Sequence, residues 1–253
     1  MKKLDYFIED DLMKRIFDII ISFFGLLFTS PLLLPVIFLV WKQDGYSPFY
    51  IADRVGKDGG IFRMVKLRSM IIKADKTGVD STSSSDKRIT PIGHFIRKLK
   101  LDELTQLWNV LIGDMSLVGP RPNVKRETDL YTNEELKLLT VKPGITDFAS
   151  IVFSDEGEIL EGYDDPDIAY NQLIRPGKGY LGIFYVSNKS IMLDIKLCWC
   201  TALLIFSKQK ALINVTGILS KLEADPSLIK LASRKYPLEP MIPPGGERIV
   251  RSR

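Results

Sequence analysis

The sequence contains a single histidine, His94, and only two cysteines, Cys198 and Cys200, among its 253 residues. One histidine argues against metal sites built on histidines and against a catalytic triad that needs histidine as its base. The cysteines are one residue apart in an apolar segment, too close for an easy disulfide and too few for a zinc site. They are expected to be inert packing residues in a protein of a reducing compartment.

The chain also lacks an internal repeat and a familiar phosphate-binding glycine loop. Its glycines fit neither a Walker loop nor the dinucleotide fingerprint of a Rossmann fold. Its 253 residues, 45% of them hydrophobic and 26% charged, are enough for one core, or for one core with a membrane element.

Charge is mild in total but unevenly distributed. The formal net charge is +4, yet residues 42–100 contain 13 Lys or Arg against 6 Asp, and residues 155–167 contain seven acids and no base. A basic block of this kind suits nucleic acid, anionic lipid or a phosphorylated small molecule, and composition does not separate the three.

One long hydrophobic run, residues 16–41, has a single charge, Asp18, in 26 residues. Roughly 20 apolar residues suffice to cross a bilayer as a helix, and the run is too long for a cleavable signal peptide. Ser30-Pro31 interrupts it near the centre and Pro35 follows, which predicts a bend at which Ser30 bonds a carbonyl that Pro31 frees. Both flanks are basic, so the positive-inside rule gives no orientation. A spanning helix and a re-entrant helix within one leaflet both remain open.

The rest of the chain predicts short strands and helices in a mixed fold. Strands are expected at 49–51 and 61–65 around a glycine turn at 56–60, and again at 145–153 and 183–186. Helices are expected from Thr90-Pro91, over 101–111 and over 190–206, with a mobile loop at 74–88 and a poorly ordered tail after Pro237. The residues expected to be buried in the first two of these helices are Ile92, Phe95, Ile96, Leu99, Leu101, Leu104, Leu107, Trp108 and Leu111.

Two adjacent carboxylates, Asp102 and Glu103, begin the most informative segment, LDELTQLWNVLIGDMSLVGPRP. An Asp at a helix start can simply cap free backbone donors, and a Glu in the first turn favours the helix dipole. The functional alternative is that one carboxylate attacks a phosphate while the other holds Mg²⁺, because neighbouring residues on a helix point about 100° apart. Both interpretations are open from the pattern.

Several cations could accompany such chemistry. Arg121 lies between Pro120 and Pro122, which restrict its backbone and favour a bidentate contact with phosphate. Lys66 and Arg68 alternate along a predicted strand and so share a face suited to phosphate or a lipid headgroup. Each could equally be an ordinary surface charge.

The whole pattern resembles the bacterial sugar transferase family, the monotopic polyprenyl-phosphate phosphoglycosyl transferases. The resemblance covers roughly residues 14–207. The segments that carry it are the basic start of the hydrophobic helix with its Ser30-Pro31 break, residues 53–57, 66–70, 101–122 and 142–146, Tyr185-Val186, Ser190 and Asp194.

The resemblance implies a transfer of phospho-sugar from a UDP-sugar to a polyprenyl (undecaprenyl) phosphate, with release of UMP. It assigns Asp102 as the nucleophile that forms an aspartyl-phosphosugar intermediate, and Glu103 as the ligand of a Mg²⁺ cofactor. Arg97 and Arg121 match arginines that bind the substrate phosphates, and Lys66 and Arg68 are taken as further phosphate-binding residues. Asp194, in an apolar helix, is expected to be paired in a salt bridge.

The implied fold is α+β and mainly helical. It has a re-entrant membrane helix-break-helix over 1–42, a small cytosolic α/β catalytic domain over 43–207 with amphipathic interfacial helices, and a C-terminal extension over 208–253. The implied setting is the cytoplasmic face of the bacterial inner membrane, at the first membrane step of surface glycan assembly. Membrane lipids are partners, nucleic acid is not, and a homodimer remains open.

One segment departs from the family pattern. After Pro143-Gly144-Ile145-Thr146 many members continue with glycine, glutamine and an arginine-containing loop, whereas this chain continues with Asp147 and then acidic residues. The donor-site arginine of that loop has no clear match, and Arg175 is a distant candidate. Two rival hypotheses are a non-catalytic membrane-anchored binding protein and a magnesium-dependent lipid diphosphate hydrolase. Neither the sugar nor the glycan pathway follows from the sequence.

Overall fold

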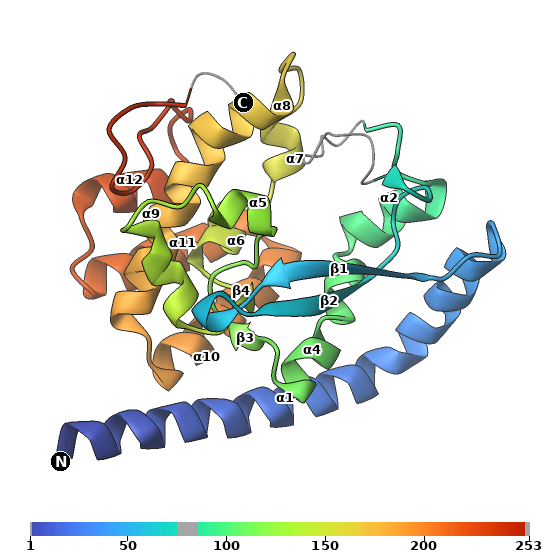
Figure 1. Ribbon diagram of the computed structural model, residues 1–253, viewed down its shortest axis with the longest axis horizontal. Coiled ribbons are helices and arrows are strands. Elements are labelled where there is room, and N and C mark those ends of the chain that lie inside the picture. The colour runs from blue at the N-terminus through green and yellow to red at the C-terminus, as the bar shows by residue number, and fades with distance from the viewer. Residues whose placement is uncertain (1, 75–85, 251–253) are drawn as a thin grey trace.

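In the residues described by the computed structural model, 2–74 and 86–250, the protein is a mainly helical α+β fold with two two-stranded sheets (Figure 1). In chain order the elements are α1 (Lys2–Lys42), β1 (Phe49–Val55), η1 (Lys57–Gly59), β2 (Ile61–Leu67), α2 (Pro91–Lys98), α3 (Leu101–Leu104), α4 (Leu107–Ile112), β3 (Ser116–Val118), α5 (Lys125–Thr128), η3 (Glu135–Thr140), β4 (Gly144–Thr146), α6 (Phe148–Val152), α7 (Glu156–Ile159), α8 (Pro166–Ala169), η4 (Tyr170–Ile174), α9 (Arg175–Asn188), α10 (Ile191–Phe206), α11 (Lys208–Lys221) and α12 (Pro226–Ser233).

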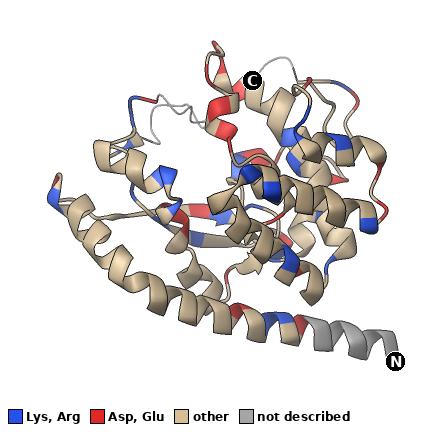
Figure 2. Cartoon of the chain, turned by 180° about the vertical axis from the view of Figure 1, so that it is seen from behind, with Lys and Arg blue, Asp and Glu red and all other residues tan. Residues whose placement is uncertain are grey.

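The apolar run forms the greater part of α1, a 41-residue helix along one side of the molecule (Figure 1). By length and composition its segment Asp11–Lys42 could cross a membrane. Beyond Asp18 the helix has no charged residue until Lys42 (Figure 2). Most of its large apolar side chains are exposed, which is costly in water and favourable in lipid.

The prolines curve α1 without breaking it. Pro31 has no backbone N–H for the carbonyl of Leu27, and the Ser30 Oγ donates to that carbonyl instead, at 2.7 Å, as predicted. The helix continues through Pro31 and Pro35 and curves along the domain, with Val36 and Val40 buried against it (Figure 1). The expected helix-break-helix is therefore one curved helix in this structure, and a re-entrant path stays a prediction.

The start of α1 is held to the domain by a buried polar cluster. The Lys14 ammonium donates to the Asp194 carboxylate and, at 3.1 Å, to the Val118 carbonyl. The Tyr185 hydroxyl donates to the same carboxylate at 2.7 Å. The predicted salt bridge of Asp194 is thus confirmed, and it joins α1, β3, α9 and α10.

Two further side chains of α1 bond to backbone groups of the domain. The Arg15 guanidinium donates to the carbonyls of Val110 and Leu111 at 2.6 and 2.7 Å, and so satisfies free acceptors at the end of α4. The Asp18 carboxylate accepts from the Leu117 N–H at 3.0 Å. Together with Lys14, these contacts fix α1 beside β3.

The predicted hairpin is confirmed, with β1 and β2 antiparallel and Phe49 paired with Leu67. Its turn uses left-handed backbone at Asp58 and Gly59. At the other end Arg68 bonds the Asp44 carboxylate through two nitrogens, at 2.5 and 2.7 Å. This pair ties the end of α1 to the strand.

The predicted start of α2 is confirmed, since the Thr90 hydroxyl accepts from the Gly93 N–H at 2.9 Å and Pro91 is in the first turn. The expected burial is partly wrong. Ile96 and Leu101 are buried against the end of α1, but Phe95, Leu99 and Trp108 are about half exposed. The region is three short helices instead of two longer ones. Phe95, Leu99 and Trp108 leave apolar side chains at its surface.

The strand expected over 145–153 is wrong beyond Thr146. Only Gly144–Thr146 forms a strand, β4, which pairs in parallel with β3. The Asp147 carboxylate accepts from the Ser150 N–H at 2.7 Å, and the Ser150 hydroxyl accepts from the Asp147 N–H at 2.8 Å. This reciprocal capping box starts α6 directly after the strand.

The strand expected over 183–186 is also wrong, because these residues belong to α9. A short apolar run does not distinguish a strand from a buried helix. Leu181 and Tyr185, four residues apart, are both fully buried, as one helix face requires. The helix predicted over 190–206 is confirmed, with Ser190 as its N-cap.

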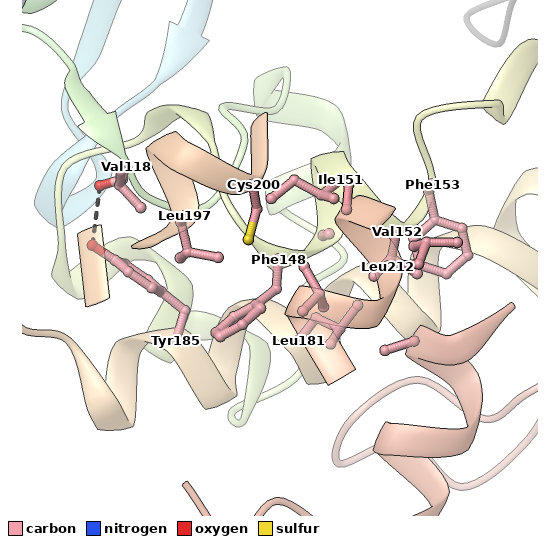
Figure 3. Close-up of a cluster of buried hydrophobic side chains, with 14 of the residues drawn as sticks. Val118, Phe148, Ile151, Val152, Phe153, Leu181, Tyr185, Leu197, Cys200 and Leu212 are labelled. Carbon is pink, nitrogen blue, oxygen red and sulfur yellow. Dashed lines mark hydrogen bonds between the residues drawn. The ribbon is translucent and has the colours of Figure 1, made fainter. Parts of the chain in front are cut away.

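Side chains of β3, α6, α9, α10 and α11 form the main core (Figure 3). Phe148, Tyr185 and Leu197 are among its largest fully buried side chains. Cys200 is buried there as a free thiol, and burial raises its pKa to about 11, as fits an inert packing residue. Helix α11 buries Ala211, Leu212, Val215 and Leu219 in this core, so the boundary at residue 207 does not separate two cores.

The segment from residue 237 to 250 has no helix or strand, yet it contacts the domain instead of forming the loose tail that was expected. The Met241 N–H donates to the Gln172 carbonyl at 3.0 Å, and the Gln172 side chain donates to the Val250 carbonyl at 2.7 Å. The end of the tail, 251–253, and most of the loop expected over 74–88 lie outside the described residues.

Candidate active site

Asp102 and Glu103 lie in the wall of a large open cavity of about 1750 Å³, between the hairpin, α2, α3, α6 and the loop that follows β3. The chain turns sharply into α3 through Lys100, whose backbone is left-handed. Asp102 therefore follows the cap position, and no side chain caps this helix, so the capping interpretation does not hold.

Two buried polar residues, Thr105 at the end of α3 and Asn109 in α4, set the position of these helices relative to β2. The Asn109 side chain accepts from the Val65 N–H at 2.9 Å and donates to the Arg63 carbonyl at 2.8 Å. The Thr105 hydroxyl bonds the carbonyl of Val65 at 3.2 Å. These contacts lie beside Lys66, so they fix the acids against that lysine.

Each carboxylate of the pair has its own cation. The Lys66 ammonium lies 3.8 Å from Asp102, and the Arg121 guanidinium lies 2.9 Å from Glu103. Their side chains are only partly exposed, between 15% and 36%, so solvent screens these charges less than it would at an open surface.

The two carboxylates have opposite pKa shifts. Burial raises the pKa of Asp102, and the Lys66 charge opposes that rise without cancelling it. Burial also acts to raise the pKa of Glu103, but the charges of Arg121, Lys100 and Lys66 outweigh it and lower the pKa to about 2. Paired acids with divergent environments are typical of sites where the two have different tasks. Glu103 is a fixed anion, and Asp102 is the more basic carboxylate.

Arg121 projects from a turn that the two short parallel strands hold. The Gly119 N–H donates to the Thr146 carbonyl and the Gly144 N–H donates to the Pro120 carbonyl, both at 3.0 Å. Gly119 and Gly144 approach so closely that neither backbone has room for a side chain. The expected restriction of Arg121 by its prolines is thus reinforced by backbone pairing.

The other predicted phosphate ligands divide into two groups. Arg97 lines the cavity from α2, and its charge acts on Asp102. Arg68 also borders the cavity, but its guanidinium is 6% exposed and bonds Asp44 and the Ser47 carbonyl. In this structure the Arg68 guanidinium therefore holds the segment after α1 against β2.

The opposite wall contains ionisable residues that sequence reasoning missed. Glu156 of α7 and Lys178 of α9 form an ion pair there, next to Tyr170. Arg175, the distant candidate for a donor-site arginine, lines the cavity too but pairs with Glu135 at 3.1 Å. The available signal was the acidic run at 155–167, which looked only like a solvated loop.

Among the residues that the structure describes, no group of three or more His, Cys, Asp or Glu has metal-binding geometry. Mg²⁺, however, is usually held by one or two carboxylates, with water and substrate phosphates as its other ligands. The adjacent oxygen donors of Asp102 and Glu103 fit that mode, and Glu103 at its lowered pKa is the better candidate.

Comparison with known proteins identifies the family to which this chain belongs. The sequence model of the bacterial sugar transferase family matches residues 9–208, which include the apolar helix and every residue of the acid–cation cluster. The chain belongs to the bacterial sugar transferase family. The resemblance of the central segment is therefore confirmed as membership.

Individual sugar transferases are similar to this chain over most of its length, as the family model is. The chain is 34% identical over 204 residues to a UDP-galactose-lipid carrier transferase of Erwinia amylovora, covering 75% of this chain and 39% of that protein. It is 35% identical over 216 residues to an undecaprenyl-phosphate galactose phosphotransferase of Salmonella typhimurium, covering 79% and 41%. It is 36% identical over 190 residues to the uncharacterized sugar transferase EpsL of Bacillus subtilis, covering 75% and 85%. The chain thus spans about two fifths of the two longer relatives.

Proposed function

We propose that this protein transfers a phospho-sugar from a UDP-sugar to polyprenyl phosphate and releases UMP. The acid pair between two cations is the observation that carries the proposal. The names of the Erwinia and Salmonella relatives, which specify a lipid carrier and undecaprenyl phosphate, support the substrate classes.

In the proposed reaction a carboxylate oxygen of Asp102 attacks the phosphorus that bears the sugar. A bond forms between this oxygen and the phosphorus, and the phosphorus–oxygen bond to UMP breaks. A phosphate oxygen of the polyprenyl acceptor then attacks the same phosphorus and displaces Asp102 as a free carboxylate. The product is a polyprenyl diphosphosugar, and the two half-reactions share one site.

Cations are needed because an anionic nucleophile meets an anionic substrate. Lys66 lies beside Asp102, and Arg121 pairs with the adjacent Glu103. Positive charge is therefore fixed where the diphosphate would bind. Arg97 approaches from the α2 wall. The fork of Arg121 suits bidentate contact with phosphate oxygens.

Glu103 is the proposed ligand of Mg²⁺, with Asp102 adjacent. When bound, the ion would supply further positive charge for the phosphate oxygens. Arg121 would then share Glu103 or turn to the substrate, because the two are paired in this structure.

The proposed setting is the cytoplasmic face of the bacterial inner membrane, with α1 in one leaflet. Buried side chains at two places along α1, Asp18 and Val40, lie against the domain, so the helix between them follows the domain instead of projecting from it. A perpendicular span would draw polar domain surface into hydrocarbon, which is unfavourable.

The direct test combines the full chain, in detergent or nanodiscs, with polyprenyl phosphate, Mg²⁺ and a panel of UDP-sugars while UMP is measured. The expected result is UMP release with at least one donor, together with an equal amount of lipid diphosphosugar, and loss of both with EDTA. Release of inorganic phosphate from a lipid diphosphate, with no UMP from any donor, would instead identify a hydrolase.

Activity is expected to fall above a pH of about 8 because Lys66 loses its proton there. Burial lowers the pKa of Lys66 to about 8, with Arg121 adding to the shift and Asp102 opposing it. Below this pH Lys66 is cationic; above it Asp102 loses its nearest positive charge. Since arginine stays protonated, Lys66→Arg should move the alkaline fall of kcat/KM to higher pH. Identical alkaline limbs in both proteins would contradict this role.

A further inference from the structure

The cavity wall formed by α7, η4 and α9 contains a second charged cluster that the proposed chemistry does not use. Lys178 donates to Glu156, and its ammonium lies over the ring of Tyr170, 5.1 Å from the centroid. All three residues line the cavity that contains Asp102. Tyr170 starts η4, a π-helical turn, and such irregular turns occur often at functional sites.

The pair is open to the cavity and has unused bonding capacity. The side chains of Lys178 and Glu156 are 17% and 35% exposed. Only one carboxylate oxygen of Glu156 is engaged, by Lys178, so the other oxygen accepts no hydrogen bond from the described residues. An ammonium has three donors, of which the carboxylate takes one. The cluster therefore presents an acceptor beside a donor.

This wall is close to the phosphate-binding arginine. Burial acts to raise the pKa of Glu156, but Lys178 and then Arg121 outweigh it and lower it. Arg121 is thus within electrostatic range of both acid clusters, and all of these residues line the same cavity. A ligand phosphate at Arg121 would extend its own substituent into the cavity that Glu156 lines.

The end of this wall that carries Glu156 lies away from the apolar helix. In Figure 1 α7 is in the upper part of the molecule and α1 runs along the lower edge, while α9 extends from the wall toward α1, where Tyr185 bonds Lys14. A lipid acceptor approaches from the side of α1, so the upper wall faces the water-soluble donor.

A hydroxyl group is the ligand that best matches an acceptor beside a donor, because it both donates and accepts. A hexose carries several of them on adjacent carbons. In the proposed reaction the sugar is bonded directly to the phosphate that Asp102 attacks, whereas the nucleoside is one phosphate further away. A cluster that shares the cavity and the electrostatic range of Arg121 therefore favours the sugar over the base.

We propose that Glu156 and Lys178, held by Tyr170, form the subsite for the sugar ring of the donor, with the carboxylate accepting from a ring hydroxyl and the ammonium donating to a neighbouring one. The proposal rests on the proposed function for its donor class. It makes the pair a determinant of which UDP-sugar is used.

Binding measurements on an inactive variant test this subsite separately from the transfer reaction. Dissociation constants for UDP and for UDP-glucose, UDP-galactose and their N-acetyl forms are measured by calorimetry on the full chain carrying Asp102→Asn, which stops turnover. At least one UDP-sugar should bind more tightly than UDP. Lys178→Met and Glu156→Gln, each added to this background, should reduce that advantage about tenfold, as expected for a lost hydrogen bond to a charged group. Binding of UDP itself should change less than about twofold.

The surface pair Lys137–Glu134 supplies the matched control, since both side chains are about half exposed and neither lines the cavity. Lys137→Met and Glu134→Gln should leave every dissociation constant unchanged. The subsite is wrong if no UDP-sugar binds more tightly than UDP, if the cavity variants retain the advantage, or if UDP weakens in parallel, which would place the pair at the nucleotide. Failure of the proposed function shows separately, as absence of UMP release by the unmodified chain.

Discussion

Replacing Asp102 with asparagine is expected to reduce UMP release by at least about 10³-fold, because loss of a nucleophile removes the covalent route. The amide is nearly the same size as the carboxylate, so folding should be preserved. The Lys66 ammonium would lose its anionic partner, now 3.8 Å away, but it lies in an open cavity accessible to water.

A labelled donor makes the prediction for Asp102 specific. With UDP-sugar labelled in the sugar and no acceptor, the unmodified chain should retain label through denaturation, and Asp102→Asn should not. Asp129→Asn is a suitable control, because Asp129 is an exposed acid that also pairs with a lysine, Lys125, outside the cavity. Retention of more than about a tenth of the activity by Asp102→Asn would rule out the covalent mechanism.

Replacing Gly144 with alanine is expected to destabilise the fold by about 3 kcal/mol or more, as severe overpacking does. A Cβ at this position would lie 2.1 Å from the Gly119 nitrogen and 2.5 Å from the Gly119 oxygen. Both atoms are backbone, so the clash is relieved only if β3 and β4 separate. That separation would also displace the turn that holds Arg121.

Gly217→Ala is the matched control for this substitution. No atom lies within 4 Å of a Cβ at Gly217, which is in α11. Alanine there should stabilise the helix by about 0.5–1 kcal/mol. Thermal unfolding in the same detergent measures both effects. A Gly144→Ala protein as stable as the parent would show that the strand pair tolerates a side chain.

The parts of the fold that the sequence predicted well depend on local chemistry. Thr90 and Pro91 start a helix through a cap and a preset backbone angle, and Ser30 bonds a carbonyl that Pro31 leaves free. The pairing of Asp194 followed from the cost of an isolated charge in an apolar helix. Each of these inferences needs only residues close in the chain or one general penalty.

The failures arose where local pattern was ambiguous or where folding joined distant segments. Residues 183–186 suit a strand as well as a buried helix, and only packing against β3 and α6 decides between them. The acid pair was conspicuous because its members are adjacent. Glu156 and Lys178 lie 22 residues apart and meet only because α7 and α9 line one cavity.

The anchoring of α1 has a consequence for how the proposed enzyme would meet its acceptor. Lys14, Arg15 and Asp18 hold one end of the helix to the domain, and Val40 is buried against it near the other. Helix and domain are therefore expected to move as one unit, which in the proposed setting would keep Asp102 and Glu103 at a constant height above the lipid. A polyprenyl phosphate in the same leaflet would need to find the site only by lateral diffusion. The search then has two dimensions, and no part of the enzyme must reach down into the bilayer at each encounter.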